Sequence, residues 1–262
     1  MIIARYAIGN DVHYGQQISP TQWRRLKGLP FETVVPTDQV DDNAQLRLLC
    51  PVHLPRIFGV GFNYAAHAKE TGHALPTRAA TFMKPDSAAI GPGEAIVYPA
   101  EGQRVDYECE LAVIIGKGGR RIAPEAVEDH NFGFTCANDV SERPIQFAEM
   151  EAGCLLIGKG FDSFCPLGPV MATGLNHRNL NISTRLNGEL RQSSNTADLV
   201  FDVVHLVSYI SQAITLRPGD VIITGTPQGI GPMLPGDVVE VEIEGIGVLR
   251  NPVVAEPGWQ AR

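Results

Sequence analysis

The alternation of hydrophobic and polar residues predicts short strands along most of the chain. Successive strand side chains point to opposite faces of a sheet, so an alternating pattern indicates a half-buried strand. Such patterns, or short apolar runs, occur at Ile2–Ala7, Val12–Gly15, Tyr107–Ile115, Phe132–Ala137, Ile182–Leu186, Leu190–Gln192 and Val238–Ile243. Asn187-Gly188, which separates the fifth and sixth of these ranges, predicts a type I′ hairpin turn.

Helical spacing of apolar residues is rarer. The clearest helix is predicted at Asp202–Leu216, with an apolar face made of Val203, Val207, Ile210 and Ile214. Asp202 can cap this helix, and Pro218-Gly219 can end it. Shorter helices are predicted at Asn63–Thr71 and Pro124–Asn131. Because the 262 residues also include 27 Gly and 19 Pro, the pattern favours a mainly β (α+β) fold over a doubly wound α/β fold.

The chain is predicted to form two domains. Residues 1–52 form a small N-terminal domain, with a turn of helix from Thr21 and a polar connector at Asp38–Asn43. Residues 53–262 are denser in strand and helix signals and form the larger domain.

Composition and charge exclude several classes of function. The formal charge of −8 argues against nonspecific nucleic-acid binding, which needs basic side chains to neutralise phosphates. We expect no membrane span, since no run of about 18 apolar residues is present. We also see no secretory signal at the start of the sequence. The five cysteines show no CxxC spacing and are expected to be reduced, mostly buried thiols of a cytoplasmic protein.

Two sets of alternating acidic residues could bind a cation. Glu108 and Glu110 point to the same face of their predicted strand, and Asp106 shares that face. Carboxylate oxygens suit Mg²⁺, Mn²⁺ or Ca²⁺. The same spacing recurs near the C-terminus at Glu240, Glu242 and Glu244. The spacing alone therefore does not separate a metal site from a solvated strand face.

Seven segments between about Pro55 and Val254 resemble, in sequence and in order, motifs of the fumarylacetoacetate hydrolase family. They are GVGFNYAAHAKE (59–70), FMKP (82–85), DYECELAVIIGK (106–117), ANDVSERPIQ (137–146), GKGFDSFCPLGP (158–169), RPGDVIITGTPQGIGP (217–232) and GDVVEVEIEGIGVLRNPV (236–253). The resemblance implies a mixed β-sandwich roll as the catalytic domain, and a homodimer formed through it.

The resemblance also implies a divalent metal, Mg²⁺ or Mn²⁺. Its ligands would be the two glutamates of the E-x-E strand and the aspartate of the NDVS segment, which are Glu108, Glu110 and Asp139. Glu240 and Glu242 fall in a family segment known for structure and not for ligation.

His67 and Glu70 stand three residues apart in NYAAHAKE, so on a helix they are neighbours on one face. A carboxylate beside an imidazole fixes its tautomer and raises its basicity, which lets the imidazole take a proton from water. Similar family members carry such a dyad on a mobile lid that closes over substrate. His73 matches no motif and is expected at the surface.

Further roles follow from the resemblance. It assigns Lys159 to neutralising the developing enolate charge, Arg143 and Gln146 to substrate contacts, and Thr226 to the substrate carboxylate. Among the other charged residues of the motifs, Lys84 is a weaker candidate for the site, and Asp162 is expected to be structural.

One segment departs from the family pattern. The family commonly reads S-A-R-D where this chain reads Ser141-Glu142-Arg143-Pro144. Pro144 removes an N–H group and an acid that could have oriented Arg143.

These residues predict a divalent-metal-dependent hydrolase that cleaves a C–C bond of acylpyruvate-like 2,4-dioxo acids through a metal-bound enolate. Its partner would be a small anionic 2-oxo acid. The same intermediate serves an oxaloacetate decarboxylase and a 2-hydroxyhepta-2,4-diene-1,7-dioate isomerase or tautomerase, which stay open as alternatives. A third alternative is a noncatalytic, metal-stabilised binding protein, against which the dyad and Lys159 argue because such a protein needs no base.

Overall fold

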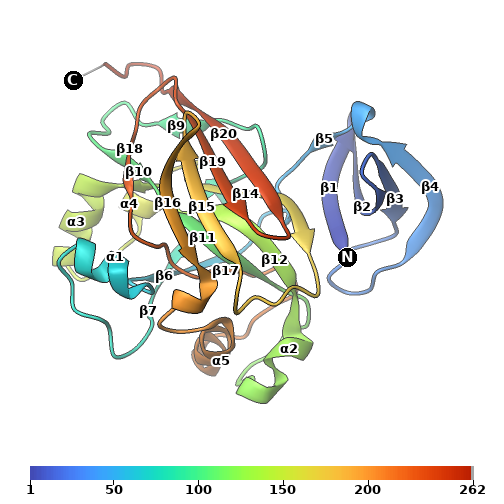
Figure 1. Ribbon diagram of the computed structural model, residues 1–262, viewed down its shortest axis with the longest axis horizontal. Coiled ribbons are helices and arrows are strands. Elements are labelled where there is room, and N and C mark those ends of the chain that lie inside the picture. The colour runs from blue at the N-terminus through green and yellow to red at the C-terminus, as the bar shows by residue number, and fades with distance from the viewer. Residues whose placement is uncertain (261–262) are drawn as a thin grey trace.

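Three β-sheets contain most of the regular structure in the computed structural model, which describes residues 1–260 (Figure 1). The strands of the largest sheet are β1 (Ile2–Ile8), β2 (Asp11–Ser19), β3 (Gln22–Leu26), β4 (Pro36–Asp42), β5 (Arg47–Leu48), β6 (Ile57–Gly61), β7 (Ala80–Lys84), β8 (Ala89–Ile90), β11 (Cys109–Ile115), β12 (Asn131–Asn138), β14 (Cys165–Ala172) and β17 (Val221–Ile223). Their order is β4-β3-β2-β1-β14-β12-β11-β17-β6-β7, with β5 beside β1 and β8 beside β14.

The two smaller sheets flank the central strands. One has the order β16 (Glu189–Asn195), β15 (Asn181–Leu186), β19 (Val238–Ile243), β20 (Gly247–Ala255) and β9 (Ile96–Tyr98). The other has the order β13 (Ser141–Glu142), β10 (Val105–Tyr107) and β18 (Gly231–Met233). Three strand pairs are parallel (β17 with β6, β14 with β8, β20 with β9), so the two larger sheets are mixed. The predicted mainly β fold is confirmed.

Helices are short and lie around the sheets. They are α1 (Ala65–Glu70), α2 (Val127–His130), α3 (Arg143–Glu151), α4 (Ile157–Gly160) and α5 (Val203–Ala213), with 3₁₀ turns η1 (Asn43–Gln45), η2 (Asp86–Ala88), η3 (Pro124–Ala126) and η4 (Thr196–Asp198). The Asp202 carboxylate caps α5 by accepting from the His205 amide at 2.8 Å. Helix α5 ends at Ala213, before the predicted end, because Ile214 is extended. No described helix is long and apolar enough to cross a membrane.

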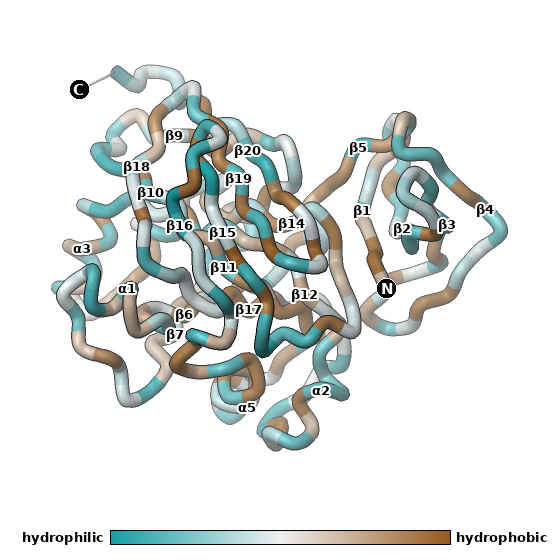
Figure 2. Tube along the Cα trace, viewed as in Figure 1, coloured by the Kyte–Doolittle hydropathy of each residue, from teal (hydrophilic) through white to brown (hydrophobic). Residues whose placement is uncertain are grey.

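The main core lies between the five-stranded sheet and the central strands of the large sheet. Leu111 of β11 belongs to one buried cluster with Ile182 of β15, Val241 of β19 and Leu249 of β20. Each is at most 1% exposed, and full burial of such a side chain stabilises the fold by roughly 1.5–3 kcal/mol. Hydrophobic segments run along α5 and the central strands in Figure 2. This packing of sheet on sheet is the sandwich that the sequence resemblance implied.

The strand and hairpin predictions in the second part of the chain are confirmed, with one break. Asn187 and Gly188 both have positive φ, 53° and 81°, as a type I′ turn requires. The predicted strand Tyr107–Ile115 is divided at Glu108 into β10 and β11, which belong to different sheets. This break places Glu108 at the junction of two sheets.

Two predictions for the N-terminal segment are wrong. The expected turn of helix after Thr21 is strand β3, because Trp23 is buried against Tyr6, with ring centroids 6.4 Å apart. The expected polar connector is strand β4, an edge strand that pairs with β3 alone among the described strands. Exposed edge strands are commonly polar, so they lack the hydrophobic alternation by which a strand is predicted from sequence. Within β4, Asp41 is buried and paired with Arg25 at 2.6 Å.

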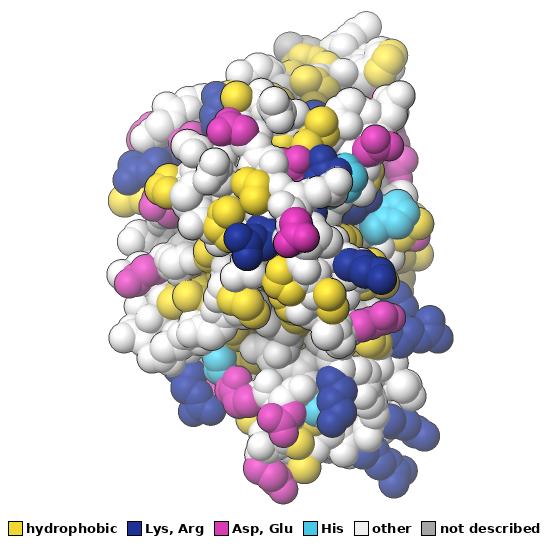
Figure 3. Space-filling model, turned by 90° about the vertical axis from the view of Figure 1, so that its right-hand side faces the viewer, with side chains coloured by type: hydrophobic (Ala, Val, Ile, Leu, Met, Phe, Trp, Pro, Cys, Tyr) yellow, Lys and Arg dark blue, Asp and Glu magenta, His cyan; other side chains and the backbone are white. Residues whose placement is uncertain are grey.

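The N-terminal strands extend the large sheet through the pairing of β1 with β14, for example Ile3 opposite Met171. The division into domains 1–52 and 53–262 stays a prediction. In Figure 3, which shows the side of the molecule where the N-terminal strands lie, acidic and basic side chains are interspersed. The net negative charge is therefore not gathered into one acidic surface on this face.

Candidate active site

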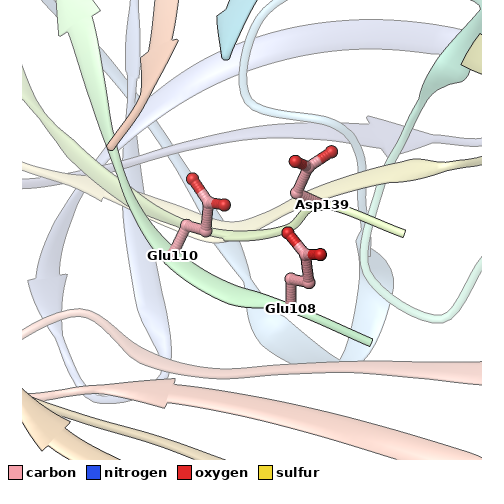
Figure 4. Close-up of side chains that lie close together, drawn as sticks. All are labelled: Glu108, Glu110 and Asp139. Atoms are coloured by element: carbon pink, nitrogen blue, oxygen red, sulfur yellow. The ribbon is translucent and has the colours of Figure 1, made fainter. Parts of the chain in front are cut away.

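Three carboxylates from neighbouring strands point toward one another (Figure 4). Glu110 lies on β11, Glu108 immediately before β11, and Asp139 immediately after β12. The register of β11 and β12 sets their positions, since Cys109 pairs with Asn138 and the Asp139 amide donates to the Glu108 carbonyl at 2.9 Å. One oxygen from each residue lies within 4.8 Å of the others, and all three residues are at most 4% exposed.

This cluster fits a hard divalent cation. Its donors are all carboxylate oxygens, the ligand class that Mg²⁺ and Mn²⁺ prefer. Within residues 1–260, the one hydrogen-bond donor to the Glu110 side chain is the Gly225 amide at 2.5 Å. Burial, together with the charges of Asp139 and Glu108, holds the pKa of Glu110 well above its usual range. A bound cation would remove this repulsion.

The second acidic set forms no such cluster. Glu242 is exposed, Glu240 pairs with Arg250 at 3.4 Å, and Glu244 accepts from the Asn181 side chain at 2.9 Å. Among the described residues, Glu108, Glu110 and Asp139 are the one group of three potential ligands that converges in this way. Asp106 does not join them, because it lies in β10 and binds Arg104 and Arg143.

Three buried cationic side chains contact the carboxylates. The Lys159 ammonium lies 2.9 Å from Glu108 and 2.6 Å from Asp139, and Arg143 Nη2 lies 2.6 Å from Glu108. Although burial by itself raises the pKa of Glu108, Lys159 and Arg143 outweigh burial and bring that pKa below its usual range. Lys84, the weaker candidate, donates to Asp139 at 2.5 Å and is 2% exposed. It is therefore part of this charge network.

Arg143 is oriented by Asp106, which the sequence places on the face of Glu108 and Glu110 without indicating this role. Its Nε donates to Asp106 at 2.9 Å, and its Nη1 donates to Gln146 at 2.7 Å. Pro144 is tolerated because it occupies the first turn of α3, where a missing N–H costs little. Glu142 caps this helix by accepting from the Ile145 amide at 2.8 Å. Asp106 thus orients Arg143 in a chain that has Pro144 in place of an acid.

The His67–Glu70 pair is formed on α1. The His67 Nδ1 lies 3.3 Å from Glu70 Oε2, and His67 is 6% exposed. The Glu70 oxygens also accept from the Gly229 amide at 3.0 and 3.2 Å, which joins α1 to the loop before β18. The Glu70 carboxylate is thus held by contacts with His67 on its own helix and with Gly229 in the loop. A mobile lid stays a prediction.

A cavity of about 220 Å³ brings most of the predicted residues together. Its polar lining includes His67, Glu108, Asp139, Arg143, Gln146, Lys159 and Thr226. Glu110 lies beside this lining, with a carboxylate oxygen within 4.8 Å of one of Asp139. Glu70 lies beside it through its contact with His67. His73 is exposed, as predicted, but it also lines the cavity. Asp162 is exposed and lies outside it.

Gln192 connects the strand that begins at Cys109 with the segment that contains Thr226 and Pro227. It was not identified from the sequence. Its Oε1 accepts from the Cys109 amide at 3.0 Å and from the Thr184 hydroxyl at 2.8 Å. Its Nε2 donates to the Thr226 hydroxyl at 2.9 Å and to the Pro227 carbonyl at 2.8 Å. Because Thr226 accepts this bond, its own proton is free to be donated into the cavity. No motif marks Gln192, since a polar residue in a strand is ordinarily exposed.

Comparison with known proteins identifies the family. The family profile described as "Fumarylacetoacetate (FAA) hydrolase C-terminal" matches residues 56–254. An oxaloacetate tautomerase of Bos taurus is 44% identical over 222 residues, which cover 80% of this chain and 70% of that protein. The structure of a 5-carboxymethyl-2-hydroxymuconate delta-isomerase from Mycobacterium smegmatis matches with a TM-score of 0.90 at 37% identity, covering 98% of this chain and all of that one (100%).

A third comparison bears on the metal. The crystal structure of fumarylpyruvate hydrolase from Pseudomonas aeruginosa, in complex with Mn²⁺ and pyruvate, matches with a TM-score of 0.74 at 36% identity. It covers 84% of this chain and 93% of that one. A member with this sequence similarity therefore binds a divalent metal together with a 2-oxo acid. From the profile match and these relatives, we conclude that the chain belongs to the fumarylacetoacetate hydrolase family.

Proposed function

We propose that this protein is a divalent-metal-dependent hydrolase that cleaves acylpyruvates into pyruvate and a carboxylic acid. The observation that carries the proposal is that His67, which is buried and paired with Glu70, lines the same cavity as Glu108 and Asp139. A hydrolase needs both a general base for water and a site that stabilises the departing enolate. The cavity offers residues for each task.

When bound by Glu108, Glu110 and Asp139, the cation supplies Lewis acidity to the two oxygens of a 2-oxo acid. Arg143, Gln146 and Thr226 would bind the substrate carboxylate, which offers acceptors to their donor groups.

Hydrolysis begins with the activation of water. His67 takes a proton from water, and the resulting hydroxide attacks the distal carbonyl carbon. The C–C bond breaks, its electron pair forms the enolate of pyruvate, and the Lys159 ammonium stabilises that negative charge. The protonated His67 then gives its proton to the enolate carbon, which yields pyruvate, and the attacked carbon leaves as a carboxylic acid.

Oxaloacetate tautomerisation is the second candidate. The similarity to the tautomerase of Bos taurus favours it. This reaction requires one proton to be removed from carbon and another to be returned, which His67 could do without water attack.

A substrate panel tests the proposal against this candidate. Purified enzyme with Mg²⁺ or Mn²⁺ would be incubated with acylpyruvates, oxaloacetate and a 2-hydroxy-dienedioate, and the products identified by NMR. We expect metal-dependent release of equimolar pyruvate and carboxylic acid from an acylpyruvate. Intact acylpyruvates together with rapid interconversion of oxaloacetate tautomers would overturn the hydrolase proposal.

The position of Gln192 gives a prediction about substrate binding. We expect Gln192→Met to raise the KM for a 2-oxo acid substrate by about 5–30-fold, since about 1–2 kcal/mol of hydrogen bonding to Thr226 and its loop is lost. Mn²⁺ affinity, measured by calorimetry, should change little, because Gln192 contacts none of the three carboxylates.

Thr184→Val is the matched control, since Thr184 bonds to the opposite end of the Gln192 amide. Both variants lose a buried hydrogen bond, so both should lower the melting temperature. Only the Gln192 variant should change KM. An equal rise of KM in both variants would show that Gln192 acts through stability alone.

A further inference from the structure

The cavity changes character from its floor to its mouth. At the floor, Glu108, Asp139 and Lys159 are at most 4% exposed. The remainder of the lining includes an apolar wall formed by Phe62, Phe82, Phe147, Met150, Leu155 and Ile230. These six residues are half-buried or exposed, and Phe147 is 49% exposed. Exposure therefore increases from the charged floor to the apolar wall.

The apolar wall is assembled from separate parts of the chain. Phe147 and Met150 stand three residues apart on α3, so they share one face of that helix. Phe82 lies on β7, and Ile230 lies in the loop before β18. Phe62 lies just before α1 and has positive φ, which turns the chain toward the His67 helix. Side chains from several elements thus converge on one apolar surface.

The basic groups that line the cavity already have partners. Arg143 is paired with Asp106 and Glu108, and Lys159 with Glu108 and Asp139.

The two histidines of the lining are also engaged. His67 contacts Glu70 at 3.3 Å. His73 contacts the Thr71 hydroxyl at 3.2 Å, and its ring centroid lies 4.4 Å from that of Phe62. Among the described residues of the lining, Arg143 and Lys159 are the basic side chains besides the histidines. The Lys159 ammonium lies 5.4 Å from the centre of the Phe82 ring, and it is already paired with Glu108 and Asp139.

We propose that the enzyme selects 2-oxo acids whose distal end is an uncharged alkyl or aryl group, and discriminates against a distal carboxylate. The proposal rests on the proposed function, in which the 2-oxo acid end occupies the charged floor. The distal end then lies against the apolar wall. Apolar groups gain from leaving water there. A carboxylate would lose hydration, and the nearby Lys159 ammonium is already paired with two carboxylates.

A matched pair of ligands tests this preference without requiring turnover. 2-Oxohexanoate and 2-oxohexanedioate differ only at the terminal carbon, which is a methyl group in one and a carboxylate in the other. We expect the Mg²⁺-loaded enzyme to bind 2-oxohexanoate at least about tenfold more tightly in calorimetry, a difference of about 1.4 kcal/mol. Equal or tighter binding of the dioate would overturn the proposal.

Two variants locate the effect. Phe147→Lys places a cation beside the predicted position of the distal group and should lower the preference at least about threefold. Leu190→Lys, on β16, makes the same change of charge at a residue that is also 49% exposed and lies outside the cavity. It should leave the preference unchanged. An unaltered preference in Phe147→Lys would overturn the placement of the distal group.

The outcomes separate this inference from the proposed function. If the preference holds but no acylpyruvate is cleaved, the hydrolase proposal fails and the selectivity stands. If acylpyruvates are cleaved but the dioate binds as well as 2-oxohexanoate, the selectivity fails and the hydrolase proposal stands. Failure of both acids to bind would overturn the selectivity and the assignment of 2-oxo acids together.

Discussion

Replacement of Glu110 by glutamine is expected to weaken Mn²⁺ binding by more than about 100-fold, since even residues that only support a metal ligand typically contribute 10–100-fold. Turnover should fall in parallel. The metal-free protein should not lose stability, because the raised pKa of Glu110 shows that its carboxylate is already disfavoured as an anion in the absence of metal. Calorimetric titration and thermal unfolding with and without Mn²⁺ would measure both effects.

Glu242→Gln is the control for this change. Glu242 also lies on an alternating acidic strand, but its side chain is exposed and converges with no group of potential ligands in the described part of the chain. Its substitution should leave metal affinity, turnover and the metal-induced rise in melting temperature unchanged. Equal Mn²⁺ affinity in Glu110→Gln and the unmodified protein would contradict the assignment of Glu110 as a ligand.

Replacement of His67 by asparagine is expected to lower kcat for acylpyruvate cleavage by about 10²–10⁴-fold, the usual contribution of a positioned general base. Mn²⁺ affinity should be retained, because His67 contacts Glu70 and not the carboxylate cluster. Decarboxylation of oxaloacetate needs no water attack, so any such activity should decrease much less. Steady-state kinetics on both substrates would show this difference.

His205→Asn supplies the comparison for His67. His205 is exposed on α5, where its ring stacks on Phe201 at 4.8 Å, and it lies outside the cavity. Its substitution should not affect cleavage. If His67→Asn and His205→Asn cleave an acylpyruvate equally fast, then His67 is not the base.

Much of the fold could be predicted from the sequence, because the hydrophobic pattern is strong in segments whose side chains are fully buried. The strands around Glu110 and Asp139 and the helix capped by Asp202 carry clear periodicity, and the structure contains them. The N-terminal errors arose where polarity reflected an edge strand, as at Asp41, which is buried with two partners, Arg25 and the Tyr6 hydroxyl. Pairing between distant segments has no local signature.

The residues of the candidate site also fall into two groups, those that a motif predicts and those that only the folded structure reveals. Motifs indicated the ligands and the His67–Glu70 pair, because those residues occur at fixed spacing. Lys84, Asp106 and Gln192 act through contacts that depend on how strands pair, as in the bonds from Gln192 to Cys109 and Thr226. The homodimer and the cytoplasmic location stay predictions. The apolar wall could not be predicted either, because its residues converge only in the folded chain.

Anomalous diffraction from a crystal grown with Mn²⁺ and oxalate tests the central claim most directly. Oxalate offers two adjacent oxygens that can chelate a metal as a 2-oxo acid does. We predict one strong manganese peak in contact with the carboxylates of Glu108, Glu110 and Asp139, with oxalate between it and the Arg143 side of the cavity. A strong peak elsewhere, or no peak among these three carboxylates, would contradict the account.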